Sequence, residues 1–395
     1  MDIERLRQET PGVGTCINLN NAGTALMPLP VIEAQRAHLR LEAEIGGQAA
    51  AARRADELEA VYIALGKLLG ASPEALALTM NATHAWQLAF YGFRFEPGDR
   101  ILTSRAEYGA NYVAFLQMRK RTGVEIEVIP DDAAGASDSA ALENMIDERT
   151  RLIALTWVPT NGGLVNPAAA VGAVARRHDI PYLLDACQAV GQIPADVGEL
   201  QCDFLTGAGR KWLRGPRGTG FLYVNSRMLE KVEPGFIDHT GARWVEPDRY
   251  RLQSTARRYE TFERAAGLQL GLGAAADYAL GIGIDAMAKR IGVLASGLRE
   301  KLAKLAGVRV RDQGEELSGI VTFDHEEMQA EAIRSALGDD SIQVSVATPD
   351  GALLDASARG LGDLVRVSPH YYNTQEELEI LLDRFERILR SAQAS

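Results

Sequence analysis

The sequence predicts an α/β protein in which a large domain with a mostly parallel, mixed sheet is joined to a smaller α+β domain. Over the first two thirds of the chain, short apolar runs alternate with amphipathic segments, the pattern of strands joined by crossover helices. After about residue 265 a long helical stretch is followed by mixed strands and helices. Since 395 residues exceed one ordinary core, we expect a large domain at 20–265 and a small one formed by 1–19 and 266–395.

The predicted large domain contains seven candidate strands. Runs such as RLIALTWV and PYLLDA are apolar at consecutive positions, as expected for strands that are covered on both faces. Amphipathic segments at 110–121 and 167–178 are typical of helices that connect parallel strands. The candidate strands are 76–80, 101–104, 125–129, 152–158, 182–185, 203–206 and 220–224.

The predicted small domain begins with an Ala- and Gly-rich helical stretch at 267–305. Its last helix opens with Thr374 and Glu377, which have the spacing of a capping box that satisfies exposed amides at a helix start. The other candidate elements are strands at 308–311, 319–323, 342–347 and 364–368 and helices at 326–337 and 374–391.

Composition and charge argue against several classes of partner. The net charge is −11 and the basic residues are scattered, so nucleic acid is not expected to bind. No apolar run approaches the roughly 20 residues of a membrane helix, and the first residues lack the apolar stretch of a secretory signal. Cys16, Cys187 and Cys202 form no CxxC pair, which fits reduced thiols and a cytoplasmic location.

Motifs for other chemistries are weak or missing. The histidines show no HxxxH spacing, so no metal site is expected, and there is no Gly-x-Ser-x-Gly elbow of a hydrolase. The stretches GPRGTG and GLQLGLG raise the alternative of a nicotinamide dehydrogenase. They do not lie between a first strand and a helix with an acidic residue about 20 positions further on, so this alternative is remote.

One of the seven lysines stands apart from the others. Six lie in helical, charge-rich surroundings that are typical of a solvated surface. Lys211 instead follows a predicted strand in GAGRKWLRGPRGTGFLYV, a glycine-dense loop where the backbone can approach a ligand closely. Desolvation there, with Arg210 and Arg214 as neighbours, favours the neutral amine that forms an imine. The alternative is an exposed lysine in a turn.

Two further features lie where open parallel sheets bind ligands, at the carboxyl ends of strands. Asp185 ends PYLLDA, where it either pairs with a protonated pyridine nitrogen or caps the next helix. Gln188 follows three residues later and could donate a hydrogen bond to a ring hydroxyl. In LALTMNATHAWQLAF, the backbone amides near Ala82 and the Thr83 hydroxyl would form an anion site at the start of a helix. A lysine, an acid and a phosphate cradle are what an enzyme that uses pyridoxal 5′-phosphate (PLP) requires.

Taken together, these segments resemble the class V aminotransferases, a fold-type I family of PLP enzymes that includes cysteine desulfurases and isopenicillin N epimerase-like proteins. The resemblance runs from INLNNAGTALMP to the carboxyl-terminal helix. It is most specific in LLDACQAVGQ, GRKWLRGPRGTGFLYV and VRVSPHYYNTQEE. It implies a fold-type I architecture, PLP as cofactor, an amino acid as substrate and a homodimer with its active sites at the subunit interface.

The resemblance also implies a role for each candidate residue. Lys211 would carry the cofactor as a Schiff base and then act as general base, while Asp185 would pair with the pyridinium nitrogen. Arg366 would hold the substrate carboxylate with its planar guanidinium. The other implied contacts are Ala82 and Thr83 for the phosphate, Tyr108 stacked on the ring, and Gln188 together with either Thr160 or Asn161 for the ring oxygen.

Three departures from the family pattern bear on the reaction. Where many relatives place Ser two residues before a His-Lys pair, this chain has Ala208-Gly209-Arg210-Lys211, and Arg210 is expected to take over a phosphate contact. The Gly-Thr pair often contributed by a partner subunit is not evident, and Thr261 is a weak substitute. Residues 340–365 contain no cysteine, whereas desulfurases need a loop thiol there to accept sulfur, so a desulfurase is disfavoured.

Finer resemblance, in LEAEIGGQAAA, AEYGAN, GRKW…GPRGTG and VRVSPH…NT, is to the ergothioneine-pathway C–S lyases. The expected reaction is therefore β-elimination from a cysteine-derived conjugate or sulfoxide, which needs no loop thiol. An aminotransferase or an amino-acid epimerase would use the same residues, and both are alternatives. A non-catalytic protein with a PLP fold is a more remote one.

Overall fold

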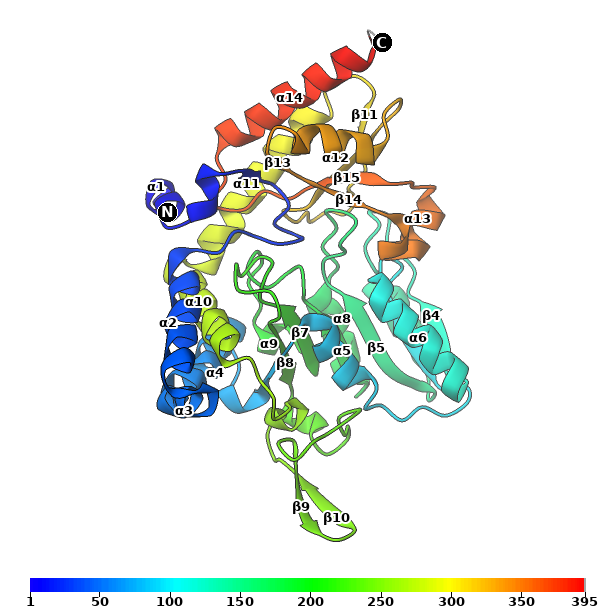
Figure 1. The fold of residues 1–395 in the computed structure, drawn as a ribbon. Helices are drawn as coiled ribbons and strands as arrows, with labels where there is room; N and C mark the ends of the chain where they lie inside the picture. The colour runs from blue at the N-terminus through cyan, green and yellow to red at the C-terminus, as the bar shows by residue number, and fades with distance from the viewer. Residues whose placement is uncertain (394–395) are drawn as a thin grey trace.

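The computed structural model describes residues 1–393 and is built on a seven-stranded sheet (Figure 1). The strand order is β2-β8-β7-β6-β5-β3-β4; β8 is antiparallel to both of its neighbours, and all other pairs are parallel. The predicted α/β class with a mostly parallel, mixed sheet is confirmed. The strands are β2 (Leu76–Thr79), β3 (Arg100–Thr103), β4 (Glu125–Val128), β5 (Thr150–Thr156), β6 (Tyr182–Asp185), β7 (Phe204–Ala208) and β8 (Gly220–Val224).

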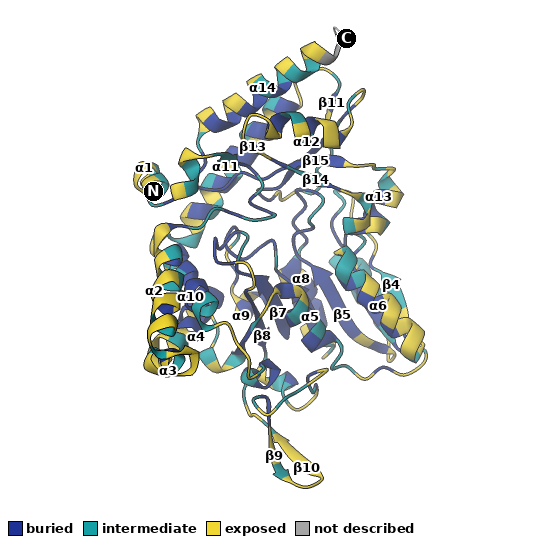
Figure 2. Cartoon of the chain, viewed as in Figure 1, coloured by how far each residue is buried: buried dark blue, intermediate teal, exposed yellow. Residues whose placement is uncertain are grey.

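Consecutive residues of the central strands pack into two different cores, which explains why these strands contain runs of consecutive apolar residues. Leu183 of β6 and Phe204 of β7 belong to one core, and the next residues, Leu184 and Leu205, belong to the other. The strands accordingly lie in the buried interior of the molecule (Figure 2). The carboxyl ends of the parallel strands are the edge at which polar side chains gather.

Helices from the connections cover both faces of the sheet. Trp86 and Phe115, on α5 and α6, lie in the core of one face, and Val171 on α8 lies in the core of the other. The predicted helices at 110–121 and 167–178 are therefore present as α6 and α8. The covering helices are α5 (Ala82–Phe90), α6 (Gly109–Thr122), α7 (Ser139–Met145), α8 (Ala168–Arg177) and α9 (Val197–Leu200).

The sequence predicts no element in residues 20–75. The structure has three helices there, α2 (Leu29–Ile45), α3 (Gly47–Arg53) and α4 (Ala55–Leu69). Of these, α2 and α4 pack against α10 (Ala266–Ile282), and α3 packs against α2 and α4. Gly273 of α10 lies so close to α4 that an added Cβ would stand 2.9 Å from Val61 Cγ2, which shows why a small residue is needed there.

A second sheet of four antiparallel strands, in the order β11-β12-β15-β14, lies beyond α10. It shares a core with α11 and α14, which contribute Leu294, Leu298 and Phe385. The elements of this part are α11 (Ile284–Leu302), β11 (Val308–Val310), β12 (Val321–His325), α12 (Ala330–Gly338), β13 (Ile342–Gln343), β14 (Ser345–Ala347), α13 (Leu353–Arg359), β15 (Leu364–Val367) and α14 (Gln375–Gln393).

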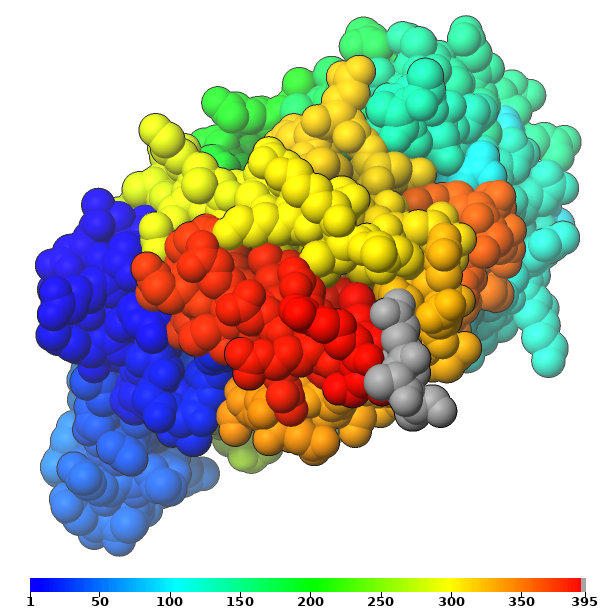
Figure 3. Space-filling model, turned by 90° about the horizontal axis from the view of Figure 1, so that it is seen from above, coloured from blue at the N-terminus to red at the C-terminus, as the bar shows by residue number. Residues whose placement is uncertain are grey.

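The amino-terminal segment packs beside these carboxyl-terminal elements. β1 (Ile17–Asn18) pairs with β13, and Arg7 of α1 (Ile3–Gln8) donates to Glu377 of α14 over 2.7 Å. Figure 3 shows the blue amino-terminal segment next to the red α14. The domain boundaries at residues 20 and 265 stay a prediction.

The structure differs from the prediction in the stretch 267–305, agrees with it at the capping box and adds one hairpin. The stretch 267–305 is not one helix, because Gly283, with φ +94°, separates α10 from α11. The capping box is present: Glu377 N donates to Thr374 Oγ1 and Thr374 N donates to Glu377 Oε2, each over 3.2 Å. An unpredicted hairpin of β9 (Ala242–Glu246) and β10 (Arg249–Leu252) projects from the large sheet's end of the molecule (Figure 1).

Short 3₁₀ turns complete the chain at η1 (Pro11–Gly14), η2 (Pro73–Ala75), η3 (Ser226–Met228), η4 (Ala256–Tyr259) and η5 (Pro349–Ala352). Within residues 1–393, no helix has both the length and the apolar character needed to cross a bilayer.

Candidate active site

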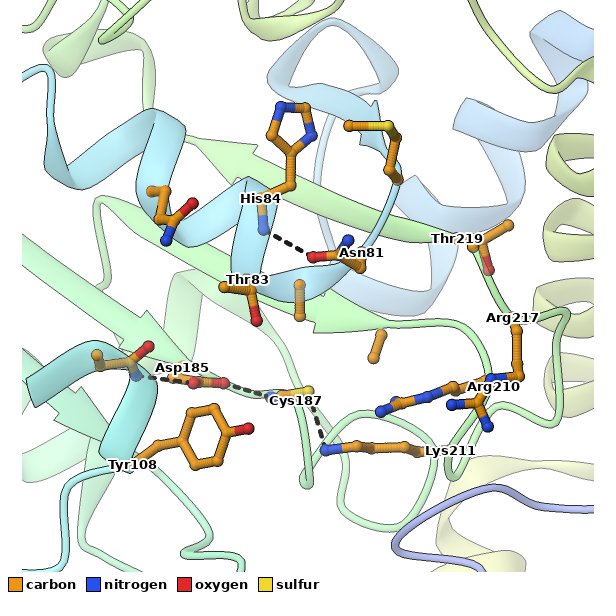
Figure 4. Close-up of a pocket in the computed structure, with 16 residues that line it drawn as sticks. Asn81, Thr83, His84, Tyr108, Asp185, Cys187, Arg210, Lys211, Arg217 and Thr219 are labelled. Carbon is orange, nitrogen blue, oxygen red and sulfur yellow. Dashed lines mark hydrogen bonds between the residues drawn. The ribbon is translucent and has the colours of Figure 1, made fainter. Parts of the chain in front are cut away.

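A cavity of about 600 Å³ opens at the carboxyl ends of the parallel strands. β2, β3, β6 and β7 each lead into a loop or helix start that borders it, as expected for ligand sites of open α/β sheets. Most of the predicted site residues line this cavity, namely Ala82, Thr83, Tyr108, Asp185, Arg210 and Lys211 (Figure 4).

Lys211 and Asp185 border the cavity on either side of Cys187. Lys211 Nζ lies 3.2 Å from Cys187 Sγ, and the backbone N–H of Cys187 donates to Asp185 Oδ1 over 2.9 Å. Figure 4 shows these groups in succession, with the Tyr108 ring beside them. The amine and the carboxylate therefore face one space, which the Tyr108 and Cys187 side chains border.

Asp185 is held by hydrogen bonds on both of its oxygens. Asn111 Nδ2 donates to Oδ2 over 2.9 Å, while Oδ1 accepts from Cys187. Burial raises the pKa of Asp185, and the bonds from Asn111 and Cys187 and the charge of Lys211 oppose that rise. No basic side chain lies within salt-bridge distance of Asp185 among the described residues, so a cationic ligand is the partner that its buried charge lacks.

The start of α5 supplies the anion-binding part of the cavity. Asn81 caps the helix by accepting from the His84 backbone N–H over 2.8 Å, which leaves Ala82 and Thr83 in the first turn facing the cavity. Gly220 at the start of β8 makes the approach possible, because a Cβ there would stand 2.4 Å from the Asn81 carbonyl carbon. Arg210 and Arg217 add positive charge at the same cavity.

Arg366 of β15 reaches the site from the small sheet. Its Nη1 donates to Thr160 Oγ1 over 2.7 Å, and its Nη2 donates to Asn20 Oδ1 over 3.3 Å. Its Nε is buried and has no hydrogen-bond partner within the described part of the chain. Burial lowers the pKa of Arg366 to about 10, and a carboxylate would satisfy both the free donor and the buried charge.

The two candidates for the ring-oxygen contact have different hydrogen-bond partners. Thr160 Oγ1 accepts from Arg366 and, over 3.4 Å, from Gln188 Nε2. The Asn161 amide points elsewhere and donates to the Thr348 carbonyl over 2.7 Å. Gln188 Nε2 also donates to the Ala22 carbonyl over 3.1 Å. Thr160, Gln188 and Arg366 are thus brought together, and Asn161 is not among them.

Arg214 does not act as the expected neighbour of the Lys211 amine. Its Nη1 donates to Tyr371 Oη over 2.7 Å, its Nε donates to the Leu26 carbonyl over 2.7 Å, and its Nη2 donates to Thr10 Oγ1 over 2.6 Å. The side chain is buried with its guanidinium over the Tyr372 ring. Arg214 therefore joins the lysine loop to the amino- and carboxyl-terminal segments.

Sequence reasoning missed two polar residues, Asn111, which lines the cavity, and Glu107, which lies behind it. Both are buried, and one Asn111 amide group donates to Glu107 Oε1 over 2.8 Å and to Asp185 Oδ2 over 2.9 Å. The only signal was in AEYGAN, where Glu107 stands just before the N-cap Tyr108 of α6 and Asn111 lies in the first turn of that helix. The sequence did not indicate that both side chains are turned inward.

The donor set fits PLP. The cavity offers an amine, a carboxylate for a ring nitrogen, an aromatic side chain for stacking and a cationic helix start for a phosphate. The unpartnered Arg366 Nε adds a donor for an amino-acid carboxylate. These residues could therefore hold the cofactor and a small amino acid together.

Comparisons with known proteins agree with this geometry. A model of the aminotransferase class-V family matches residues 17–381. The chain is 27% identical over 395 residues to a probable cysteine desulfurase of Methanothermobacter thermautotrophicus, with 98% of each chain covered. It is 31% identical over 408 residues to a cysteine desulfurase of Dickeya dadantii, covering 98% of this chain and 97% of the relative. An apo cysteine desulfurase structure from Thermococcus onnurineus superimposes with a TM-score of 0.91 at 26% identity, over 98% of both chains.

These comparisons correct the predicted reaction. The β-elimination lyase acting on a cysteine conjugate or sulfoxide is wrong, because relatives at 27% to 31% identity over nearly the full chain are named cysteine desulfurases. The argument from the missing loop thiol against a desulfurase is overturned by the same finding. The predicted fold-type I architecture is confirmed by the likeness to the Thermococcus desulfurase.

Proposed function

The chain belongs to the class-V aminotransferase family, and from this premise we propose that it is a cysteine desulfurase, an enzyme that takes sulfur from cysteine and leaves alanine. It is a PLP-dependent enzyme. The observation that carries the proposal is the cavity in which Lys211, Asp185 and the start of α5 meet, in a chain that aligns with cysteine desulfurases over nearly its whole length.

Each side chain has a task that follows from its position. When bound, PLP withdraws electrons from the substrate Cα. Lys211 Nζ holds the cofactor and moves the Cα proton, and Asp185 keeps the ring nitrogen protonated. Tyr108 stacks on the ring, while Ala82, Thr83 and Arg210 bind the phosphate.

The other end of the site binds and orients the substrate. Arg366 binds the substrate carboxylate through Nε, while its contacts with Thr160 and Asn20 fix the guanidinium plane. Thr160 and Gln188, rather than Asn161, approach the ring oxygen.

The sulfur acceptor is a thiol that enters from solution. Residues 340–365 contain no cysteine, and Cys202 is fully buried. Cys187 lines the cavity, but it lies between Asp185 and Lys211, so a flat ring that reaches from one to the other covers its Sγ. The acceptor sulfur bonds to the substrate sulfur as the Cβ–S bond breaks, and the products are a persulfide and alanine. All three cysteines are free thiols, which supports the cytoplasmic location that we also propose.

The protein acts as a homodimer. Three large apolar side chains stand exposed beside the cavity: Met80 at 60%, Phe236 at 54% and Phe262 at 58% of their full accessible surface. Met80 borders the cavity, and Phe236 stacks on His84, which also borders it. A second copy that covered this surface would bury the apolar groups and cover the neighbouring pocket, which Thr261 lines and which shares Met80 and His84 with the cavity.

The direct test supplies the holoprotein with less than one equivalent of L-cysteine, with and without dithiothreitol, and quantifies the products. We expect alanine in proportion to the cysteine consumed, and sulfide release that depends on dithiothreitol. Lys211→Ala should abolish the formation of alanine. Lys231→Ala, at an exposed lysine paired with Asp179, should not. Pyruvate and ammonia in place of alanine would refute the desulfurase, and a persulfide trapped on Cys187 would refute the external acceptor.

A further inference from the structure

A second buried carboxylate, Glu107, lies behind Asp185, and the proposed catalysis does not use it. Its side chain is 3% exposed. Glu107 Oε2 accepts from Thr103 Oγ1 over 2.9 Å and from the Thr156 N–H over 3.1 Å, while Oε1 accepts from Thr156 Oγ1 over 2.6 Å. Within residues 1–393, no basic side chain lies within salt-bridge distance of it.

Asn111 links this carboxylate to the site. Its Nδ2 carries two hydrogens, and it donates to Glu107 Oε1 over 2.8 Å and to Asp185 Oδ2 over 2.9 Å. Asn111 is itself 1% exposed, so water does not compete for the two bonds. The amide orientation is fixed by having an acceptor on each side, and that orientation keeps a donor on Asp185.

We propose that Glu107 is a positioning residue for the cofactor, which acts through Asn111 to orient Asp185 and to keep negative potential behind the ring nitrogen. Thr103 at the end of β3 and Thr156 at the end of β5 hold Glu107, and the Asp185 carbonyl accepts from the Trp157 N–H over 3.0 Å. The network therefore connects the ends of β3, β5 and β6 through Asp185, whose proposed partner is the ring nitrogen. The inference rests on the cofactor and not on which amino acid is the substrate.

Replacing Glu107 by Gln breaks the link while keeping the shape. A Gln amide that retained its oxygen toward Thr156 N–H would turn its NH₂ toward Asn111 Nδ2, so two donors would face each other. A flip of the Asn111 amide would relieve that conflict but would place its oxygen against Asp185 Oδ2. In either case Asp185 loses its orientation, and the negative charge behind it is lost as well.

The experiment measures the dissociation constant of PLP from holoprotein by equilibrium dialysis, and the nitrogen-15 shift of ring-labelled PLP. Glu107→Gln should weaken the binding of PLP about tenfold. It should also move the nitrogen-15 shift toward the value of an unprotonated pyridine. Glu260→Gln is the matched control, because Glu260 is also a buried carboxylate, bonded to Tyr62 Oη and the Leu78 N–H. The dissociation constant of PLP from Glu260→Gln should stay within twofold of that from the original protein.

Asn111→Ala makes the test independent of whether the Gln variant folds. It should cause the same loss of affinity and the same shift, and adding Glu107→Gln to it should change binding by less than twofold, since the two residues act in series. The proposal is overturned if either single variant binds PLP like the original protein. It is also overturned if Glu107→Gln still lowers the affinity for PLP about tenfold in a protein that already carries Asn111→Ala.

Discussion

Arg366 combines burial with an incomplete set of partners. A guanidinium that is 8% exposed and has an unpartnered Nε within the described residues is stabilised when a carboxylate arrives. The residual exposure is small, so water contributes little to the solvation of the free form. In the proposed function, the carboxylate of the substrate completes this part of the site.

Replacing Arg366 by Lys should raise the KM for cysteine about tenfold or more and change kcat less. Lysine keeps the charge, but its single nitrogen cannot hold Thr160 and Asn20 and also bind a carboxylate. Steady-state alanine formation measures both constants, and Arg309→Lys, on an exposed side chain paired with Asp324, is the control. An unchanged KM would argue against Arg366 as the carboxylate ligand.

Glu107 gives the cofactor-free protein a pH-dependent stability. Burial raises the pKa of Glu107 from 4.5 to about 7, although bonds from Thr156, Asn111 and Thr103 oppose the rise. The folded protein therefore holds this proton more tightly than the unfolded chain. The stabilisation is fully present below pH 4.5 and is lost as the pH rises through about 7.

Glu107→Gln cannot ionise, so the unfolding free energy of the original protein should fall relative to that of the variant between pH 5 and pH 8. We expect a change of about 2 kcal/mol, measured by urea unfolding of cofactor-free protein. Asp185 and Tyr182 interact electrostatically with Glu107, so their own titration belongs to the measured difference. A constant difference across this range would show that Glu107 stays charged in both states.

Single residues with unusual local sequence were predictable, and residues oriented by tertiary packing were not. Lys211 and Asp185 follow strand ends, and both line the cavity. Arg214 differs from expectation because it is bound by a remote partner, the Tyr371 hydroxyl, and the choice between Thr160 and Asn161 was open because sequence does not show that the Asn161 amide donates to the Thr348 carbonyl. Glu107 was missed because an acidic residue in a polar segment normally faces solvent, and its buried partners Thr103 and Thr156 lie on two different strands.

At the scale of elements, the approach of β8 to the start of α5 shapes the phosphate site. The first turn of α5 lies where a side chain on Gly220 would have to be. Gly220→Ala should therefore displace Asn81 and Ala82 and lower the affinity for PLP about tenfold. Gly281→Ala is the control, since no atom lies within 4 Å of its added Cβ, and it should leave affinity unchanged. Equal affinities for both variants would contradict the assigned phosphate site.

The elements with the clearest periodicity were predicted best. Strands covered on both faces gave continuous apolar runs, and each of the seven is present in the large sheet. The helices at 29–69 were missed because no predicted strand precedes them, so they do not connect two strands of the alternating pattern. The break at Gly283 was missed because Ala-rich sequence on both sides supports helix, and one positive φ decides the outcome.

At the scale of the whole molecule, the exposed Phe236, Met80 and Phe262 predict self-association. Phe236→Ser together with Phe262→Ser should shift the protein from dimer to monomer and reduce alanine formation. Sedimentation velocity measures the first effect, and Trp244→Ser, a 75% exposed residue on the β9–β10 hairpin, tests whether any exposed aromatic has the same effect. An original protein that sediments as a monomer at micromolar concentration would contradict the dimer.

The reaction was the part of the molecule that the sequence predicted wrongly. The missing thiol in residues 340–365 was taken to disfavour a desulfurase, although the acceptor from solution that we propose would satisfy the same chemistry. Electron withdrawal by the cofactor is common to lyases, transferases and desulfurases, so Lys211 and Asp185 do not distinguish among them. Full-length similarity to cysteine desulfurases supplied the information that local motifs lacked.

The central claim, that the Lys211 amine carries the cofactor opposite Asp185, is tested most directly by reducing the holoprotein with borohydride and mapping its peptides by mass. We expect a pyridoxyl phosphate adduct on the peptide that contains Lys211, and no absorbance band of an internal imine in Lys211→Ala. An adduct on any of the other six lysines, or a reducible band that persists in the variant, would contradict the claim.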